Sequence, residues 1–373
     1  MRNKLNVSSL RENFCFCIAQ DEEPYNHREW YMLKISSEKD KGEEAGRSWE
    51  IRFVKLPMQL RGAYLAFHLD DRRQGELDRV PMLSPVVKLK LGNFRNRRFT
   101  GTPFWFYGTS SASVGSFVYH IERYCDEGKY SRNVRYFDSS HPEEGLKTGP
   151  RTICPRFDAA VVGLHRNLYV MGFDGSGASL DIPSMWGEFL DTRLVGEGHA
   201  EWCALPDSPS TLGSKYLFAA ALGSYFSGKI LVRNQYTHAM CLYDVTEKSW
   251  ESLDPIVEYY NGFTSTPIVV GANLYWIRGP NVWVYDFLKK TLVSLPIGDS
   301  KICWLIKRSY REMGPTLVHL AGDLFYLIWI GEDCESVCCT KVQVSTDPEA
   351  VFVFACHNFR FDHMVRLLDC FPL

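Results

Sequence analysis

Hydrophobic and polar positions alternate in short runs along this chain, and long amphipathic helical patterns are scarce. The strongest apolar runs are rich in β-branched and aromatic residues and are bounded by Gly, Pro, Asn or Asp, which is typical of strands. Four of them cover residues 167–172, 228–232, 272–277 and 322–328. Each follows another apolar run across a short polar or Gly-containing step, so the pattern predicts a series of β-hairpins.

A third apolar segment recurs after the hairpins, and it ends on Asp each time. The residues that close it are Asp138, Asp191, Asp244 and Asp286. Asp at the end of a strand favours a turn, because its carboxylate accepts N–H bonds from the next residues. We therefore expect these four side chains to cap equivalent turns.

A fourth segment carries Trp or Leu three residues before a second Leu, in residues 201–206, 249–254 and 291–296. The four Asp residues that end the third segments are 53, 53 and 42 positions apart along the chain. Four strands in such a period are the signature of a β-propeller blade. Trp202 and Trp250 are then expected to be core residues that pin one blade onto the next.

The order hairpin, Tyr-Asp, Trp and Leu-Pro resembles the kelch repeat, best in residues 156–296. One Gly of the family's usual pair after the second strand is kept, in Met171-Gly172. The divergent repeats look like those of plant F-box/kelch proteins. That resemblance implies a β-propeller that binds a protein partner and recruits it to a cullin–Skp1 ubiquitin ligase. Because strands begin near Phe14, we expect a kelch-only relative without an F-box.

The repeats predict an all-β chain with a tail over residues 1–13 and one propeller over residues 14–373. We expect six four-stranded kelch-like blades, with seven as the alternative. Residues 14–57 supply a first blade, and residues 62–91 supply another. The first strands and the final segment are expected to share a blade, which removes exposed strand edges.

Composition and charge limit the classes of partner and of cellular location that we expect. Hydrophobic residues make up 45% of the chain and aromatic residues 14%, which favours a large folded core over disorder. A formal net charge of -2, with no apolar run long enough to span a bilayer, argues against nucleic acid and membrane as partners. Without a signal-peptide pattern we expect a cytoplasmic or nuclear protein with reduced cysteines, of which Cys15, Cys17, Cys203 and Cys241 are expected to be buried.

Motifs that carry chemistry are weak. Cys334, Cys338 and Cys339 have no second cysteine pair nearby, so thiols are favoured over a zinc site. Residues 88–98 hold five basic side chains, but the first alternate with apolar ones as in a half-exposed strand. Neither a Gly-x-Ser-x-Gly elbow in a strand-to-helix context nor a His-Glu-x-x-His motif occurs. We therefore assign no catalytic, cofactor-binding or metal-binding residue.

Two functional hypotheses follow. The first is a non-enzymatic scaffold that binds a partner protein through loops on a propeller face, where specificity usually lies. Its candidate contacts, in the insertion over residues 173–187, are Asp174, Ser176 and Trp186. The alternative is an enzyme with a small polar substrate in the central channel, for which Asp158, His165 and His319 are the candidates on or beside inner strands.

Overall fold

The computed structural model describes a large part of the chain. The backbone is described for residues 12–20, 27–37, 49–52, 87–90, 111–122, 131–156, 159–172, 185–196, 198–213, 217–222, 226, 228–234, 237–253, 267–300, 302–303, 306, 315–331, 336–347, 349–360 and 365–372. Side chains are described for those of these residues that lie between 111 and 354. Every statement below refers to this part of the chain.

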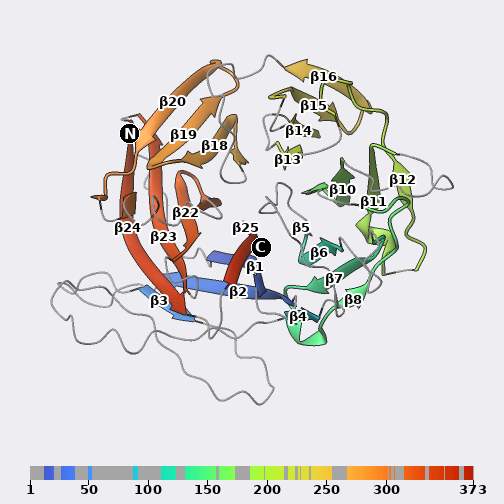
Figure 1. Cartoon of the computed structure of the whole chain (residues 1–373), viewed down its shortest axis with the longest axis horizontal. Coiled ribbons are helices and arrows are strands. Elements are labelled where there is room, and N and C mark those ends of the chain that lie inside the picture. Colours follow the sequence, from blue (N-terminus) through green and yellow to red (C-terminus); the bar gives the residue numbers. More distant parts are fainter. Residues whose placement is uncertain are drawn as a thin grey trace, which may run out of the picture.

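Five four-stranded antiparallel sheets form the blades of a β-propeller (Figure 1). In chain order they are β5 (Ser111–Val114), β6 (Phe117–Ile121), β7 (Val134–Asp138) and β8 (Lys147–Thr148); β9 (Ala160–Leu164), β10 (Asn167–Met171), β11 (Gly187–Asp191) and β12 (Trp202–Ala204); β13 (Leu217–Ala221), β14 (Lys229–Asn234), β15 (Met240–Asp244) and β16 (Ser249–Leu253); β17 (Ile268–Val270), β18 (Asn273–Arg278), β19 (Asn281–Asp286) and β20 (Thr291–Pro296); and β21 (Thr316–Ala321), β22 (Leu324–Ile330), β23 (Ser336–Thr346) and β24 (Glu349–Arg360). We number these blades 1 to 5. The predicted all-β propeller is confirmed.

A further sheet of five strands lies between blade 5 and blade 1 (Figure 1). It contains β1 (Glu12–Gln20), β2 (His27–Ser37), β3 (Trp49–Arg52), β4 (Val87–Lys90) and β25 (Val365–Pro372). The C-terminal β25 pairs with the N-terminal β1, and it contacts β21, β22 and β5. The two ends of the chain therefore meet in one sheet, as the sequence predicts.

The prediction of six or seven four-stranded blades is wrong in the count, since five sheets have that composition. Residues 62–91 were expected to supply a separate blade, yet β4 pairs with β2 in the same sheet as β1. Residues 62–68 lie outside the described residues. An apolar strand pattern marks a strand but leaves its pairing partner open, and the count depended on that partner.

The residues of each strand alternate between two blade interfaces. In β9, Val161 packs toward blade 1, whereas Ala160 and Val162 pack toward blade 3. Four hydrophobic clusters result, one for each pair of neighbours among blades 1 to 5. The described core is thus a series of interfaces between neighbouring blades, because blades 2 to 4 bury apolar side chains on both of their faces.

The innermost strands approach each other closely at Gly163. A Cβ atom built on this residue would lie 2.1 Å from the carbonyl oxygen of Ser113 in β5 and 2.9 Å from Val114 Cγ2. No side chain fits at that separation. Glycine is therefore required in β9 for blades 1 and 2 to come together at the centre of the ring.

The two ends of the blades differ in their connections. At one end, the turn face, β5–β6, β9–β10, β17–β18 and β21–β22 are joined by the two-residue turns 115–116, 165–166, 271–272 and 322–323. At the other end, the linker face, the second and third strands of blades 1 and 2 are joined by residues 122–133 and 172–186. The links between blades also start and end at strand ends on this face, and they cover residues 149–159, 205–216, 254–267 and 297–315.

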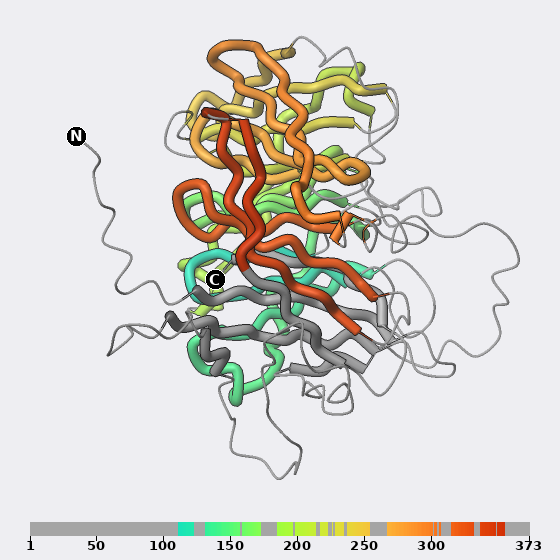
Figure 2. Tube along the Cα trace, turned by 90° about the vertical axis from the view of Figure 1, so that its left-hand side faces the viewer, coloured from blue at the N-terminus to red at the C-terminus, as the bar shows by residue number. Residues whose placement is uncertain are grey.

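The longest described hairpin belongs to blade 5. Figure 2 shows β23 and β24, in red, running along the side of the ring toward the orange strands of blade 4. An isolated parallel bridge joins Val351 of β24 to Ile297, which follows β20. In the described part of the chain no helix is long and apolar enough to cross a membrane.

The cysteine prediction holds at one position and fails at another. Cys241 in β15 is a buried thiol near Ser252, and burial raises its pKa. Cys203 was expected to be buried and is exposed. It lies in β12, the outermost strand of blade 2, where the neighbouring Trp202 takes the inward position and Cys203 the outward one. The side chains of Cys15 and Cys17 lie outside the described residues.

Candidate functional site

The turn face repeats one device in four blades. The carboxylate of each Asp that ends a third strand accepts a backbone N–H from the turn that follows: Asp138 from Ser140 (2.9 Å), Asp191 from Arg193 (3.1 Å), Asp244 from Thr246 (2.9 Å) and Glu247 (3.0 Å), and Asp286 from Leu288 and Lys289 (2.9 Å each). Each bond caps the start of the connection that follows. The turn face therefore repeats the same Asp cap in four blades, although the connections after β7 and β11 are longer than those after β15 and β19.

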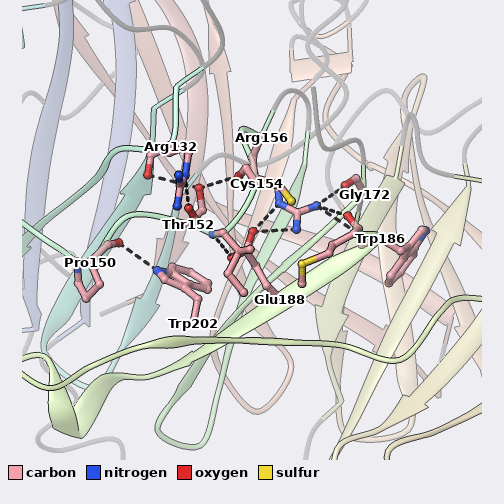
Figure 3. Close-up of polar contacts among 11 residues, drawn as sticks. Arg132, Pro150, Thr152, Cys154, Arg156, Gly172, Trp186, Glu188 and Trp202 are labelled. Atoms are coloured by element: carbon pink, nitrogen blue, oxygen red, sulfur yellow. Dashed lines mark hydrogen bonds and ion pairs between the residues drawn. The ribbon is translucent and has the colours of Figure 1, made fainter. Parts of the chain in front are cut away.

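Two Trp residues join neighbouring blades. Trp202 is buried against the cluster between blades 1 and 2, and its Nε1 donates to the carbonyl of Pro150, 3.0 Å away (Figure 3). Trp250 packs between blades 2 and 3, with its ring centroid 4.9 Å from that of Tyr243. Both indoles thus contribute to the interfaces that close the ring.

A buried ion pair lies on the linker face of blade 2. Arg156 precedes β9, Glu188 is the second residue of β11, and both side chains have no exposed surface. Nε of Arg156 donates to Oε1 of Glu188 at 2.8 Å, and Nη2 lies 2.7 Å from the same oxygen. Oε2 accepts the backbone N–H of Ile153 at 2.6 Å. The charges are neutralised within the protein, which buried charges require.

The remaining terminal nitrogen of Arg156 points at the backbone. Nη1 donates to the carbonyl of Gly172 at 2.8 Å and to that of Met185 at 3.0 Å (Figure 3). We call Arg156, Glu188, Ile153, Gly172 and Met185 the Arg156 cluster. It joins the link before blade 2 to both ends of the connection between β10 and β11.

The link itself is tied to blade 1. Thr152 N–H donates to the carbonyl of Arg132 at 3.0 Å, and Arg132 Nε donates back to the carbonyl of Thr152 at 2.5 Å. Arg156 N–H donates to the carbonyl of Ser131 at 3.2 Å. Residues 150–156 are therefore fixed between two blades (Figure 3).

Other blades use different residues at the same end. In blade 1, Glu122 accepts from Asn133 Nδ2 and from Arg135 Nε, each at 2.8 Å. In blade 3, Asn234 Nδ2 donates to the carbonyl of Leu212 at 2.6 Å. Polar contacts on the linker face are thus specific to each blade, unlike the repeated Asp caps.

The three predicted partner contacts are placed only in part. Asp174 and Ser176 lie outside the described residues. Trp186 is partly buried, its Nε1 donates to the carbonyl of Gly213 at 2.8 Å, and its ring meets Trp250 edge-on with centroids 5.0 Å apart. Trp186 therefore anchors the end of the 172–186 connection to the next blade.

The predicted enzyme residues are not joined by any contact within the described residues. His165 is exposed in the β9–β10 turn of blade 2, with a φ of 57°. His319 belongs to blade 5, where Nε2 lies 3.1 Å from the carbonyl of Gly322 and the ring packs on Phe325. Burial lowers the pKa of His319. Asp158 lies outside the described residues.

The described residues form no candidate metal site. Among the described residues no group of three or more His, Cys, Asp or Glu side chains is placed to hold a metal ion. Cys338 and Cys339 are both buried in β23, and Cys334 lies outside the described residues.

Sequence reasoning missed the Arg156 cluster. Arg156 and Glu188 lie 32 positions apart in the chain and share no motif, and only Glu188 belongs to a repeated strand segment. The one available signal was Glu188 within the short strand sequence Gly-Glu-Phe-Leu-Asp, where a charged residue occupies an inward position.

Sequence comparisons add no family. No protein-family model matches the chain, and no curated protein matches it either. The kelch resemblance therefore stays a prediction from the repeat pattern.

Proposed function

We propose that this protein is a non-enzymatic scaffold that binds a partner protein through the linker face of its propeller. One observation carries the proposal: the strand ends that bear the long connections of blades 1 and 2, and those that bear the long links between blades, lie at the same end of the blades. Long connections in a compact domain are commonly functional. The rigid scaffold holds their ends in place, and its stability does not depend on the sequence of the connection, which is free to suit a partner.

The chemistry of the described residues supports binding rather than catalysis. The buried charges of the Arg156 cluster are engaged with each other and with backbone groups. The enzyme candidates His165 and His319 belong to the turn face and to different blades. The resemblance to F-box/kelch proteins supports a protein as the partner, within or beside a cullin–Skp1 ubiquitin ligase.

The experiment is affinity purification of the tagged full-length protein, followed by mass spectrometry. A variant replaces residues 174–183 with a Gly/Ser segment of equal length and keeps Gly172, Met185 and Trp186, since these three hold the base of the connection. The matched control, His165→Asn with Arg166→Ser, changes two exposed residues on the turn face.

A partner that the wild type and the control recover, and the 174–183 variant loses, is the expected result. Equal recovery by all three proteins would contradict the linker face as the binding surface. Recovery of a cullin and Skp1 together with the partner would add the ligase assignment. If the wild type recovers no partner, the scaffold proposal fails.

A further inference from the structure

Arg156 contacts both ends of one connection. Gly172 follows β10 and Met185 precedes β11 by two residues, so the carbonyls that accept from Nη1 of Arg156 lie at the beginning and the end of the segment 173–184. The backbone N–H of Gly172 also donates to the carbonyl of Trp186 at 2.8 Å. One guanidinium thus closes the base of this connection.

Glu188 holds the guanidinium in the required orientation. Both side chains are fully buried, and Oε1 of Glu188 engages Nε and Nη2, which leaves Nη1 directed at the two carbonyls (Figure 3). A planar guanidinium bonded on one edge by a carboxylate presents its remaining donors in a fixed direction. A lysine ammonium is a point charge without this fork.

A second anchor acts from the other side. Trp186 reaches the carbonyl of Gly213, in the link that leads to blade 3, whereas Arg156 belongs to the link that enters blade 2. The base of the 172–186 connection is therefore bonded to both neighbouring links. The separation of its two described ends, Gly172 and Met185–Trp186, is set by residues of these links.

We infer that Arg156 is a positioning residue for partner binding: with Glu188 it fixes the base of the 172–186 connection, so that the linker face is preorganised before a partner arrives. The inference rests on the proposed scaffold function. Preorganisation raises affinity because less conformational entropy is lost on binding. Arg156 then affects binding without touching the partner.

The test separates this role from ordinary stabilisation. The double variant Arg156→Met/Glu188→Leu removes both charges together and fills their volume, a replacement that leaves buried ion-pair sites folded in other proteins. Arg156→Lys, examined beside it, keeps the charge opposite Glu188 but loses the fork. Trp202→Phe is the matched control, since it removes a hydrogen bond of similar length to the same link, at Pro150.

Hydrogen–deuterium exchange by mass spectrometry gives the first readout. In both Arg156 variants we expect the amide of Gly172, and the peptide that contains it, to exchange about tenfold faster, because its carbonyl partner at Trp186 is less constrained. The strands of blades 3 to 5 should exchange as in the wild type, and Trp202→Phe should leave Gly172 unchanged. Unchanged exchange at Gly172 in a folded Arg156 variant would overturn the inference.

Recovery of the wild-type partner gives the second readout. We expect the Arg156 variants to recover it at least severalfold less than Trp202→Phe does. Full recovery despite faster exchange at Gly172 would also overturn the inference, since the base would then be irrelevant to binding. Absence of any partner for the wild type instead removes the scaffold proposal, while exchange at Gly172 still decides whether Arg156 holds the base.

Discussion

The two faces of the propeller differ in how their polar contacts are arranged. On the turn face, four blades use the same Asp cap after the third strand, and each cap accepts backbone N–H bonds from the turn that follows it. On the linker face, blades 1 to 3 use different polar residues, and those of blades 2 and 3 bond the link that precedes each blade. Local and repeated contacts serve the fold of a single blade, whereas long-range and unique contacts determine how the blades present their connections.

The largest effect is expected on the linker face. Arg156→Ala leaves the carboxylate of Glu188 buried without its counter-charge, so we expect a loss of about 3–5 kcal/mol in the free energy of unfolding. Urea denaturation followed by tryptophan fluorescence measures it. Arg193→Ala is the matched control on the turn face, because it also removes an arginine from an ion pair, here with Asp191, but its side chain is 60% exposed.

The control should lose much less stability than Arg156→Ala. Similar losses of unfolding free energy in the two variants would contradict the distinction between the faces. They would mean that burial and long-range contact do not make the Arg156 pair contribute more to stability than the exposed pair.

The next effect concerns the ring that both faces share. Gly163→Ala places a Cβ atom against the backbone of β5, and relief of the overlap requires the inner strands to separate. Overpacking of this kind typically costs about 1–3 kcal/mol, and a clash with backbone belongs at the upper end. Gly149→Ala is the control, since its nearest neighbour is a side-chain atom 3.4 Å away. Differential scanning calorimetry of both variants should show a lower Tm for Gly163→Ala alone.

A smaller effect is expected for a single cap on the turn face. Asp244→Ala removes the acceptor of two backbone N–H groups, and at about 0.5–1.5 kcal/mol for each hydrogen bond the loss should be about 1–3 kcal/mol. Asp244→Asn keeps a side-chain oxygen and should lose less. Denaturation at pH 7 distinguishes the three proteins.

The same cap predicts a pH dependence. The hydrogen bond from Glu247 N–H lowers the pKa of Asp244. The N–H of Thr246 and the charge of Lys229 lower this pKa further, whereas burial raises it. Because the folded pKa lies below the unfolded one, the cap stabilises fully above the unfolded value of about 3.9 and loses this contribution as pH falls through the folded pKa. The stability difference between wild type and Asp244→Asn should therefore shrink below about pH 4. A difference that is constant with pH would contradict the role of the charged form.

The smallest effect sharpens the local character of the turn face. Lys248 closes the turn that Asp244 caps, and its φ of 51° lies in the left-handed region. Lys248→Gly removes that strain, but glycine also gives the unfolded chain more conformational freedom, which offsets part of the gain. The net stabilisation should be about 0.5 kcal/mol. Lys248→Ala keeps the strain and should show no gain. A stabilisation by alanine as well would assign the effect to charge instead.

How far the sequence predicted the molecule differs between the two faces. The strand ends at Asp138, Asp191, Asp244 and Asp286 were located to the residue, because the turn chemistry and the strand period recur in each blade. Arg156 and Glu188 were not identified, since nothing in their local sequences shows that they meet. The sequence predicts Trp186 as a partner contact, and the structure adds its bond to Gly213 and its contact with Trp250.

The sequence by itself determined the class of fold, the hairpins and the repeated caps, because each depends on periodicity or on contacts within a few residues. It also predicted that the first and last strands share a sheet, because a closed ring leaves no exposed strand edge. Tertiary structure alone decided the number of four-stranded blades and the pairing of β4 with β2. It also decided that Arg156 joins the two ends of the 172–186 connection. The physical reason is the same in each case. The edge of a strand can hydrogen-bond to many other strands, and a buried charge can pair with many counter-charges. Which pairing forms is therefore fixed only when the whole ring has folded.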